Sequence, residues 1–228
     1  MLNLRTRLHR WARILAASLA FAAGSALPAR ACDTALLLAV DVSNSVDESE
    51  YRLQIDGMAD ALLDPEIMLA LVEGQVTLSV MQWSGRERQA MSVSWTQMRS
   101  EADVLRFSDV ARGLERAFIM SDTAPAEAID FALAQFAAVG HCARHIIDVS
   151  GDGTPNSGSD VRDARGRAER QGVTINGIAI ESMGLAISTF YRRALITRNG
   201  FVITARGHRD YPRAIRTKIL REVSRVVG

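Results

Sequence analysis

Residues 35–45 read Ala-Leu-Leu-Leu-Ala-Val-Asp-Val-Ser-Asn-Ser, an apolar run that ends abruptly in a short polar loop. A short run that is apolar at every position indicates a β-strand buried on both faces, as in parallel sheets covered by helices. The loop places one carboxylate, Asp41, and two hydroxyls, Ser43 and Ser45, at alternate positions. In an open α/β sheet ligands bind at the carboxyl ends of the strands, so this loop is the first candidate for a functional site.

Four further stretches share this continuous apolar character. They predict buried strands at residues 76–81, 145–149, 173–180 and 201–204. Between them, apolar residues recur at helical spacing, which predicts amphipathic helices packed on the sheet. These helical faces are formed by Tyr51, Ile55, Met58 and Leu62, by Ile129, Leu133 and Phe136, and by Ile215, Ile219, Val223 and Val226. Strands that alternate with helices predict a doubly wound, mostly parallel α/β sheet with helices on both faces.

Residues 91–96 differ, because Met-Ser-Val-Ser-Trp-Thr alternates apolar and polar side chains. This alternation indicates an edge strand with one face in water, antiparallel to the strand at 76–81 through a turn at Ser84-Gly85. Helix starts are marked by capping residues and prolines. They fall at Asp47 with Glu50, at Pro125, and at Asp210 before Pro212.

The first 31 residues have a composition of their own. Four arginines between positions 5 and 13 precede an apolar run at 14–27, which closes with Ala29-Arg30-Ala31. This pattern predicts a secretory signal peptide over residues 1–31 and one domain over residues 32–228. The apolar run is shorter than the roughly 20 residues of a membrane-spanning helix, so we expect no membrane span after cleavage.

Cleavage there would remove five arginines and no acid, which moves the formal charge from +1 to −4. We therefore expect a mildly acidic periplasmic or secreted protein with no electrostatic footprint for nucleic acid. The only two cysteines, Cys32 and Cys142, are expected to form a disulfide in an oxidising compartment. Two alternatives are less favoured. One is a lipid anchor on Cys32, and the other is a zinc site formed by His141, Cys142 and His145.

Two further polar loops lie next to predicted elements, one after a buried strand and one before a helix. Residues 146–153, Ile-Ile-Asp-Val-Ser-Gly-Asp-Gly, place Asp152 between two glycines after a buried run. Residues 121–125, Ser-Asp-Thr-Ala-Pro, place Thr123 before a helix, with Ser121 and Asp122 as alternatives. If the three loops meet, their oxygens would surround one cation. Hard oxygen ligands favour Mg²⁺, with Mn²⁺ or Ca²⁺ as alternatives.

Together these loops resemble the metal-ion-dependent adhesion site (MIDAS) of von Willebrand factor A domains. In that family Asp-x-Ser-x-Ser follows the first strand, a threonine precedes a middle helix, and an aspartate follows the fourth strand. The matching residues, in order and spacing, are Asp41, Ser43, Ser45, Thr123 and Asp152. The resemblance covers about residues 35–226, and it is nearest to an uncharacterised family of exported bacterial A-like proteins, a domain of unknown function. The similar stretches are residues 148–153 and Ala205-Arg206-Gly207.

The resemblance implies that Ser43 and Ser45 bind the metal directly. The other three residues would bind it directly or through water. It also implies that the first and fourth strands are adjacent, which would make the two cysteines neighbours at the opposite edge of the sheet. The serine and aspartate before Thr123 depart from the glycines common in the wider family.

Two titratable residues, Asp148 and His208, lie outside the motif. Asp148 falls inside a buried run, where a lone carboxylate is costly. We expect it either to orient Ser43 or a bound water, or to bond to neighbouring backbone. His208 lies near the last helix and is expected at the surface.

The leading functional hypothesis is an exported, metal-dependent protein-binding module, an adhesion or scaffold protein and not an enzyme. Its partner protein would present a carboxylate to the metal. One alternative is a metal-assisted hydrolase of phosphate or sulfate esters, for which Asp148 is the only candidate base. Another is a structural envelope protein whose metal site is vestigial.

Overall fold

A six-stranded sheet forms the centre of the protein in the computed structural model, which describes residues 32–224. The predicted signal peptide and Val226 lie outside these residues. The strands are β1 (Thr34–Asp41), β2 (Thr77–Trp83), β3 (Gln89–Gln97), β4 (Arg144–Gly151), β5 (Val173–Ile180) and β6 (Val202–Ala205). Their order is β3-β2-β1-β4-β5-β6, and only β3 pairs antiparallel with its neighbour. The predicted mostly parallel sheet with one antiparallel edge strand is confirmed.

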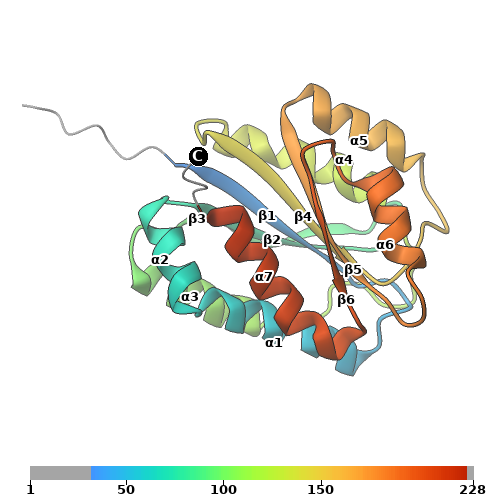
Figure 1. Ribbon diagram of the computed structural model, residues 1–228, viewed down its shortest axis with the longest axis horizontal. Coiled ribbons are helices and arrows are strands. Elements are labelled where there is room, and N and C mark those ends of the chain that lie inside the picture. Colours follow the sequence, from blue (N-terminus) through green and yellow to red (C-terminus); the bar gives the residue numbers. More distant parts are fainter. Residues whose placement is uncertain (1–31, 225–228) are drawn as a thin grey trace, which may run out of the picture.

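Helices cover both faces of this sheet, as Figure 1 shows. One face carries α1 (Glu48–Leu62), α2 (Pro65–Glu73), α3 (Glu101–Arg112) and α7 (Tyr211–Val223). The other carries α4 (Pro125–Gln135), α5 (Val161–Arg170) and α6 (Ala186–Phe190). Short helical turns lie at Phe136–Val139, Tyr191–Leu195 and His208–Asp210. The arrangement is a three-layer sandwich, so the inner strands are buried on both sides.

The continuous apolar character of β1 is explained by its central position. Leu36 and Leu38 enter the core shared with α1 and α7, whereas Leu37 and Ala39 enter the core shared with α4 and α5. Asp41 continues the second row, so its carboxylate points to the α4 side of the sheet. The prediction that residues 201–204 are buried on both faces is wrong. Three of the four residues of β6 are only half-buried, because β6 is an edge strand.

The helix that follows the β1 loop is fixed at its start by a capping box. Asp47 accepts a hydrogen bond of 2.8 Å from the backbone N–H of Glu50, and Glu50 accepts one of 2.9 Å from the N–H of Asp47. Such reciprocal caps satisfy two of the free N–H groups at a helix start. The predicted cap at Asp47 is confirmed, and it fixes Glu50 beside the polar loop.

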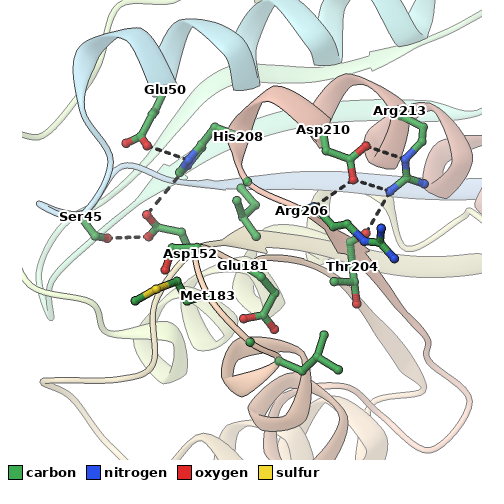
Figure 2. Close-up of a pocket in the computed structure, with 15 residues that line it drawn as sticks. Ser45, Glu50, Asp152, Glu181, Met183, Thr204, Arg206, His208, Asp210 and Arg213 are labelled. Carbon is green, nitrogen blue, oxygen red and sulfur yellow. Dashed lines mark hydrogen bonds and ion pairs between the residues drawn. The ribbon is translucent and has the colours of Figure 1, made fainter.

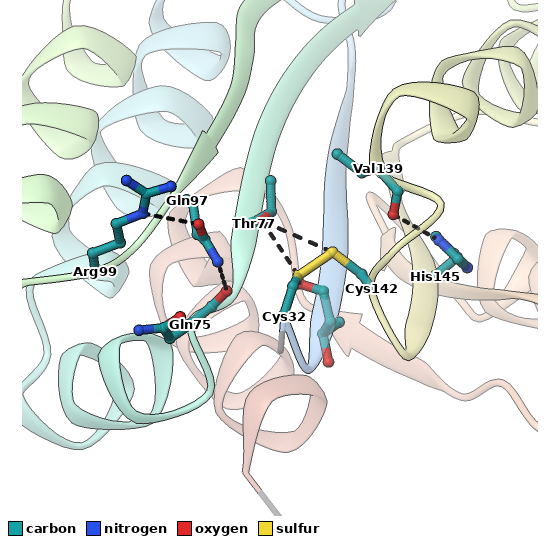
Figure 3. Close-up of a disulfide and its surroundings, with 9 residues drawn as sticks. Cys32, Gln75, Thr77, Gln97, Arg99, Val139, Cys142 and His145 are labelled. Carbon is teal, nitrogen blue, oxygen red and sulfur yellow. Dashed lines mark hydrogen bonds between the residues drawn. A yellow bond between two sulfur atoms is a disulfide. The ribbon is translucent and has the colours of Figure 1, made fainter. Parts of the chain in front are cut away.

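A disulfide joins Cys32 and Cys142, as predicted (Figure 3). The two Cα atoms are 4.6 Å apart, just ahead of β1 and β4. These strands are adjacent and parallel, with Thr34 opposite Arg144. The bridge therefore lies at the end of the sheet opposite to the polar loops. It occupies the sulfur of Cys142, which removes the thiolate that the zinc alternative required.

Within residues 32–224, no helix has both the length and the apolar character required to cross a bilayer.

Candidate metal site

The loops after β1 and β4 meet at the carboxyl end of the sheet because the two strands run side by side. Ser45 donates a hydrogen bond of 2.5 Å from Oγ to Oδ1 of Asp152. The hydroxyls of Ser43 and Ser45 are 3.2 Å apart and share a hydrogen bond. The backbone N–H of Ser43 donates to Oδ1 of Asp41 at 2.8 Å. Four of the five predicted ligands are thus linked in one network.

The third loop reaches the same place. A methyl group built on Gly153 would lie 3.6 Å from Oγ1 of Thr123 and 4.0 Å from Oγ of Ser45. Asn156 holds the threonine, because the N–H of Thr123 donates to Oδ1 of Asn156 at 2.8 Å. Ser121 was an alternative to Thr123, but its hydroxyl accepts a hydrogen bond from the N–H of Gly85. Thr123 is therefore the hydroxyl of this loop that is directed to the other two loops.

Asp41 carries the strongest sign that the site is built for a cation. Its side chain is fully buried, and its Oδ2 makes no hydrogen bond within residues 32–224. Burial raises the pKa of Asp41 to about 7, against the opposing effect of hydrogen bonds from Ser43. An unpartnered buried carboxylate oxygen is costly, and a divalent cation beside it would remove that cost. The residues present therefore fit a divalent cation.

Arg116 supports the loop from outside, which the sequence did not reveal. Its Nη2 donates to the carbonyl oxygens of Val42 and Ser43, at 2.9 and 2.8 Å. The N–H of Val42 donates to the carbonyl of Trp83 in β2 at 2.9 Å. These contacts fix the loop backbone that carries Asp41 and Ser43.

The expectation that Asp148 orients Ser43 or a bound water, or bonds to neighbouring backbone, is wrong. Asp148 lies opposite Leu38 of β1, and its Oδ1 is 2.5 Å from Nζ of Lys218 in α7. Lys218 also donates to Glu222 at 2.6 Å, and Asn176 donates to the same carboxylate at 2.7 Å. Burial raises the pKa of both Asp148 and Glu222, against the influence of Lys218. Asp148 is thus part of a buried ion cluster under α7, on the opposite face of the sheet from Asp41.

The expectation that His208 lies at the surface is also wrong. The residue is only 8% exposed. Its Nδ1 lies 3.1 Å from Oε1 of Glu50, and its Nε2 lies 3.9 Å from Oδ2 of Asp152 (Figure 2). Gly207 precedes it with a φ of +83°, a backbone conformation that glycine adopts readily, and this turn directs the histidine inward. An imidazole therefore borders the predicted metal site.

The strand order, with helices on both faces of the sheet, defines a von Willebrand factor A-like α/β fold. Similar solved structures include proximal thread matrix protein 1 from the mussel byssus, with a TM-score of 0.63 and 14% identity over 83% of this chain and 47% of that chain. A von Willebrand factor type A protein from Catenulispora acidiphila has a TM-score of 0.59 and 15% identity, over 84% and 43% of the two chains. This chain spans just under half the length of those proteins. At such low identity the likeness shows the fold.

The chain belongs to the family described as "Protein of unknown function (DUF1194)", whose family model matches residues 31–227. The expected membership of an uncharacterised A-like family is thereby confirmed. The comparison with curated proteins found no match. A second structure of the mussel protein has a zinc-occupied MIDAS motif, with a TM-score of 0.62 and 15% identity over 85% of this chain and 46% of that chain.

Proposed function

We propose that this protein is an exported, metal-dependent binding module, an adhesion or scaffold protein that recognises a protein partner. The ligands would be Asp41, Ser43, Ser45, Thr123 and Asp152. The observation that carries the proposal is the buried, unpartnered Oδ2 of Asp41 beside a network of hydroxyls that ends on Asp152. A structural role alone would not require an uncompensated carboxylate there.

The donor set indicates the kind of cation and the kind of partner. Carboxylate and hydroxyl oxygens favour Mg²⁺, and Mn²⁺ or Ca²⁺ are the alternatives. Two carboxylates balance the charge of a divalent ion, whereas the three hydroxyls are neutral. The bound cation would remain a Lewis acid with one coordination position for a further anionic oxygen. A carboxylate of a partner protein meets that requirement.

The rim of the site supports a macromolecular partner. Ile119 and Met120 are 68% and 88% exposed, and they precede Ser121, whose carbonyl accepts a hydrogen bond from Asn44 of the metal loop. Met183, on another loop, is 88% exposed and lines the same cavity as Asp152. Exposed apolar side chains gathered around a polar centre are typical of protein-binding surfaces.

Affinity capture from an envelope extract tests this function. The bait is the purified protein with Mg²⁺, the same protein with chelator, or the Asp41→Ala variant with Mg²⁺. Asp109→Ala, a change of an exposed acid on α3, is the matched control. We expect the wild type and the control to retain the same partner only with Mg²⁺, and Asp41→Ala to lose it. A partner retained equally by all four samples would refute metal-dependent recognition.

A hydrolase is the second candidate because His208 gives the site an imidazole that the sequence analysis did not place there. A bound cation with a nearby base can support ester hydrolysis. Turnover of a phosphate or sulfate ester by the purified protein, lost in Asp41→Ala, would replace the binding proposal. A vestigial site would instead give no heat of binding with Mg²⁺ or Mn²⁺.

A further inference from the structure

A polar cavity of about 1190 Å³ adjoins the predicted metal site. Ser45 and Asp152 form its border with that site, and His208 and Glu50 continue its wall (Figure 2). Asp210 and Arg213 form an ion pair farther along the same wall, at 2.7 Å. The MIDAS proposal assigns no role to Glu50 and His208.

Three side chains from separate segments converge in this wall. Glu50 comes from the first turn of α1, Asp152 from the loop after β4, and His208 from the turn before α7. One ligand atom of each lies within 4.8 Å of the others. Imidazole nitrogens and carboxylate oxygens are common ligands of transition-metal ions.

The imidazole nitrogen that faces Asp152 provides an independent observation. Nε2 of His208 is buried and makes no hydrogen bond within residues 32–224. Its distance of 3.9 Å to Oδ2 of Asp152 is too long for a hydrogen bond. It is within the sum of one Zn–N and one Zn–O bond, about 4.2 Å. One cation between the two atoms would therefore satisfy both.

The other ring nitrogen is arranged as in metal-binding histidines. Such histidines commonly pair their second nitrogen with a carboxylate, which fixes the ring and the tautomer. Nδ1 of His208 lies 3.1 Å from Oε1 of Glu50. Oε2 of Glu50 is in turn held by the N–H of Asp47 in the capping box. The ring is thus oriented so that Nε2 faces Asp152.

We propose that Glu50, Asp152 and His208 form a second cation site beside the MIDAS. Asp152 is shared between the two sites, because its Oδ1 accepts from Ser45 whereas its Oδ2 faces His208. His208 and Asp152 bind the ion, Glu50 orients the ring, and water from the cavity completes the coordination. The nitrogen ligand makes this site prefer Zn²⁺ over Mg²⁺, unlike the all-oxygen site next to it.

Calorimetric titration of the purified, untagged protein with Zn²⁺ under saturating Mg²⁺ tests the second site. We expect one Zn²⁺ per chain in addition to one Mg²⁺. His208→Ala should weaken Zn²⁺ binding at least about 100-fold while Mg²⁺ binding stays within about twofold. His141→Ala, which removes an exposed histidine next to the disulfide, is the matched control and should bind both ions as the wild type does.

Asp41→Ala separates this proposal from the proposed function, because it removes the MIDAS and should leave Zn²⁺ binding in place. If His208→Ala does not fold, Glu50→Gln takes its place, with Zn²⁺ binding expected to weaken about 10- to 100-fold. Unchanged Zn²⁺ affinity in His208→Ala, or in Glu50→Gln where that variant replaces it, would overturn the second site. So would a Zn²⁺ ion that only displaces Mg²⁺ and leaves one cation per chain.

Discussion

Oγ of Ser45 lies 2.5 Å from Oδ1 of Asp152, although 107 positions separate the two residues in the sequence. The contact follows from the parallel pairing of β1 and β4, in which Val40 lies opposite Ser150. Both loops leave adjacent strands at the same end of the sheet, so the strand register brings the two side chains together. The strand register therefore positions the two ends of the candidate site.

Gly151 provides a test of how closely the site is packed around Asp41. A Cβ at this position would lie 2.8 Å from both Oδ2 of Asp41 and the hydroxyl of Tyr191. We expect Gly151→Ala to displace the carboxylate and to weaken Mg²⁺ binding at least about tenfold, or about 1.4 kcal/mol. Calorimetry measures this affinity. Gly166→Ala, whose added methyl would contact only the end of Arg170, is the control, and equal affinities in both variants would contradict the prediction.

The disulfide should stabilise the fold without affecting the metal site. Replacement of Cys32 and Cys142 by serine removes a bridge across 110 positions of the sequence. We expect the free energy of unfolding to fall by about 2–5 kcal/mol, as measured by denaturant titration. Affinity for Mg²⁺ should stay within about twofold, because the bridge lies at the opposite end of β1 and β4. A large loss of affinity in a folded variant would show coupling that we do not expect.

The buried lysine is expected to be a major contributor to stability. Lys218 lies between Asp148 and Glu222, and all three side chains are almost fully buried. Lys218→Met would leave two buried carboxylates without a cation, which should cost about 3–5 kcal/mol. Chemical denaturation measures the loss. Combining Lys218→Met with Asp148→Asn and Glu222→Gln should recover part of the stability. No recovery would argue against electrostatics as the cause of the loss.

The same cluster gives the stability a defined pH dependence. Burial raises the pKa of Asp148 and Glu222 above their ordinary values of 3.8 and 4.5. The folded protein therefore holds protons that the unfolded chain releases. The contribution of these two protonated carboxyls to the free energy of unfolding is complete below about pH 4 and is lost as the pH rises. We expect Glu222→Gln to flatten the fall in unfolding free energy between pH 5 and 8. The exposed Glu73→Gln is the control, and identical slopes in the two variants would contradict this assignment.

The sequence predicted the strands well because their apolar runs are continuous where the sheet is covered on both faces, as at β1. It did not predict α5, whose segment is rich in charged residues and buries only Val161, Ala164 and Ala168. The partners of Asp148 and His208 were missed for a different reason. Lys218 and Glu50 reach them from helices far away in the sequence, and no local pattern indicates such contacts.

The positions of the five proposed MIDAS residues could be predicted from spacing because each follows a strand or precedes a helix, where the fold itself determines the position. That they bind a cation stays a prediction. Residues that support them were not found in this way. Arg116 contacts the loop through backbone carbonyls, which carry no signal in the identities of Val42 and Ser43. Supporting contacts of this kind become visible only when the chain is folded.

Calorimetric titration with Mg²⁺ of the wild type, Asp41→Ala and Asp152→Ala, each checked for folding by circular dichroism, tests most directly whether the loops after β1 and β4 hold one cation between them. We expect one Mg²⁺ per chain in the wild type and no measurable binding in either variant. An unchanged binding heat in a folded Asp41→Ala or Asp152→Ala protein, or no heat in the wild type, would contradict the metal site.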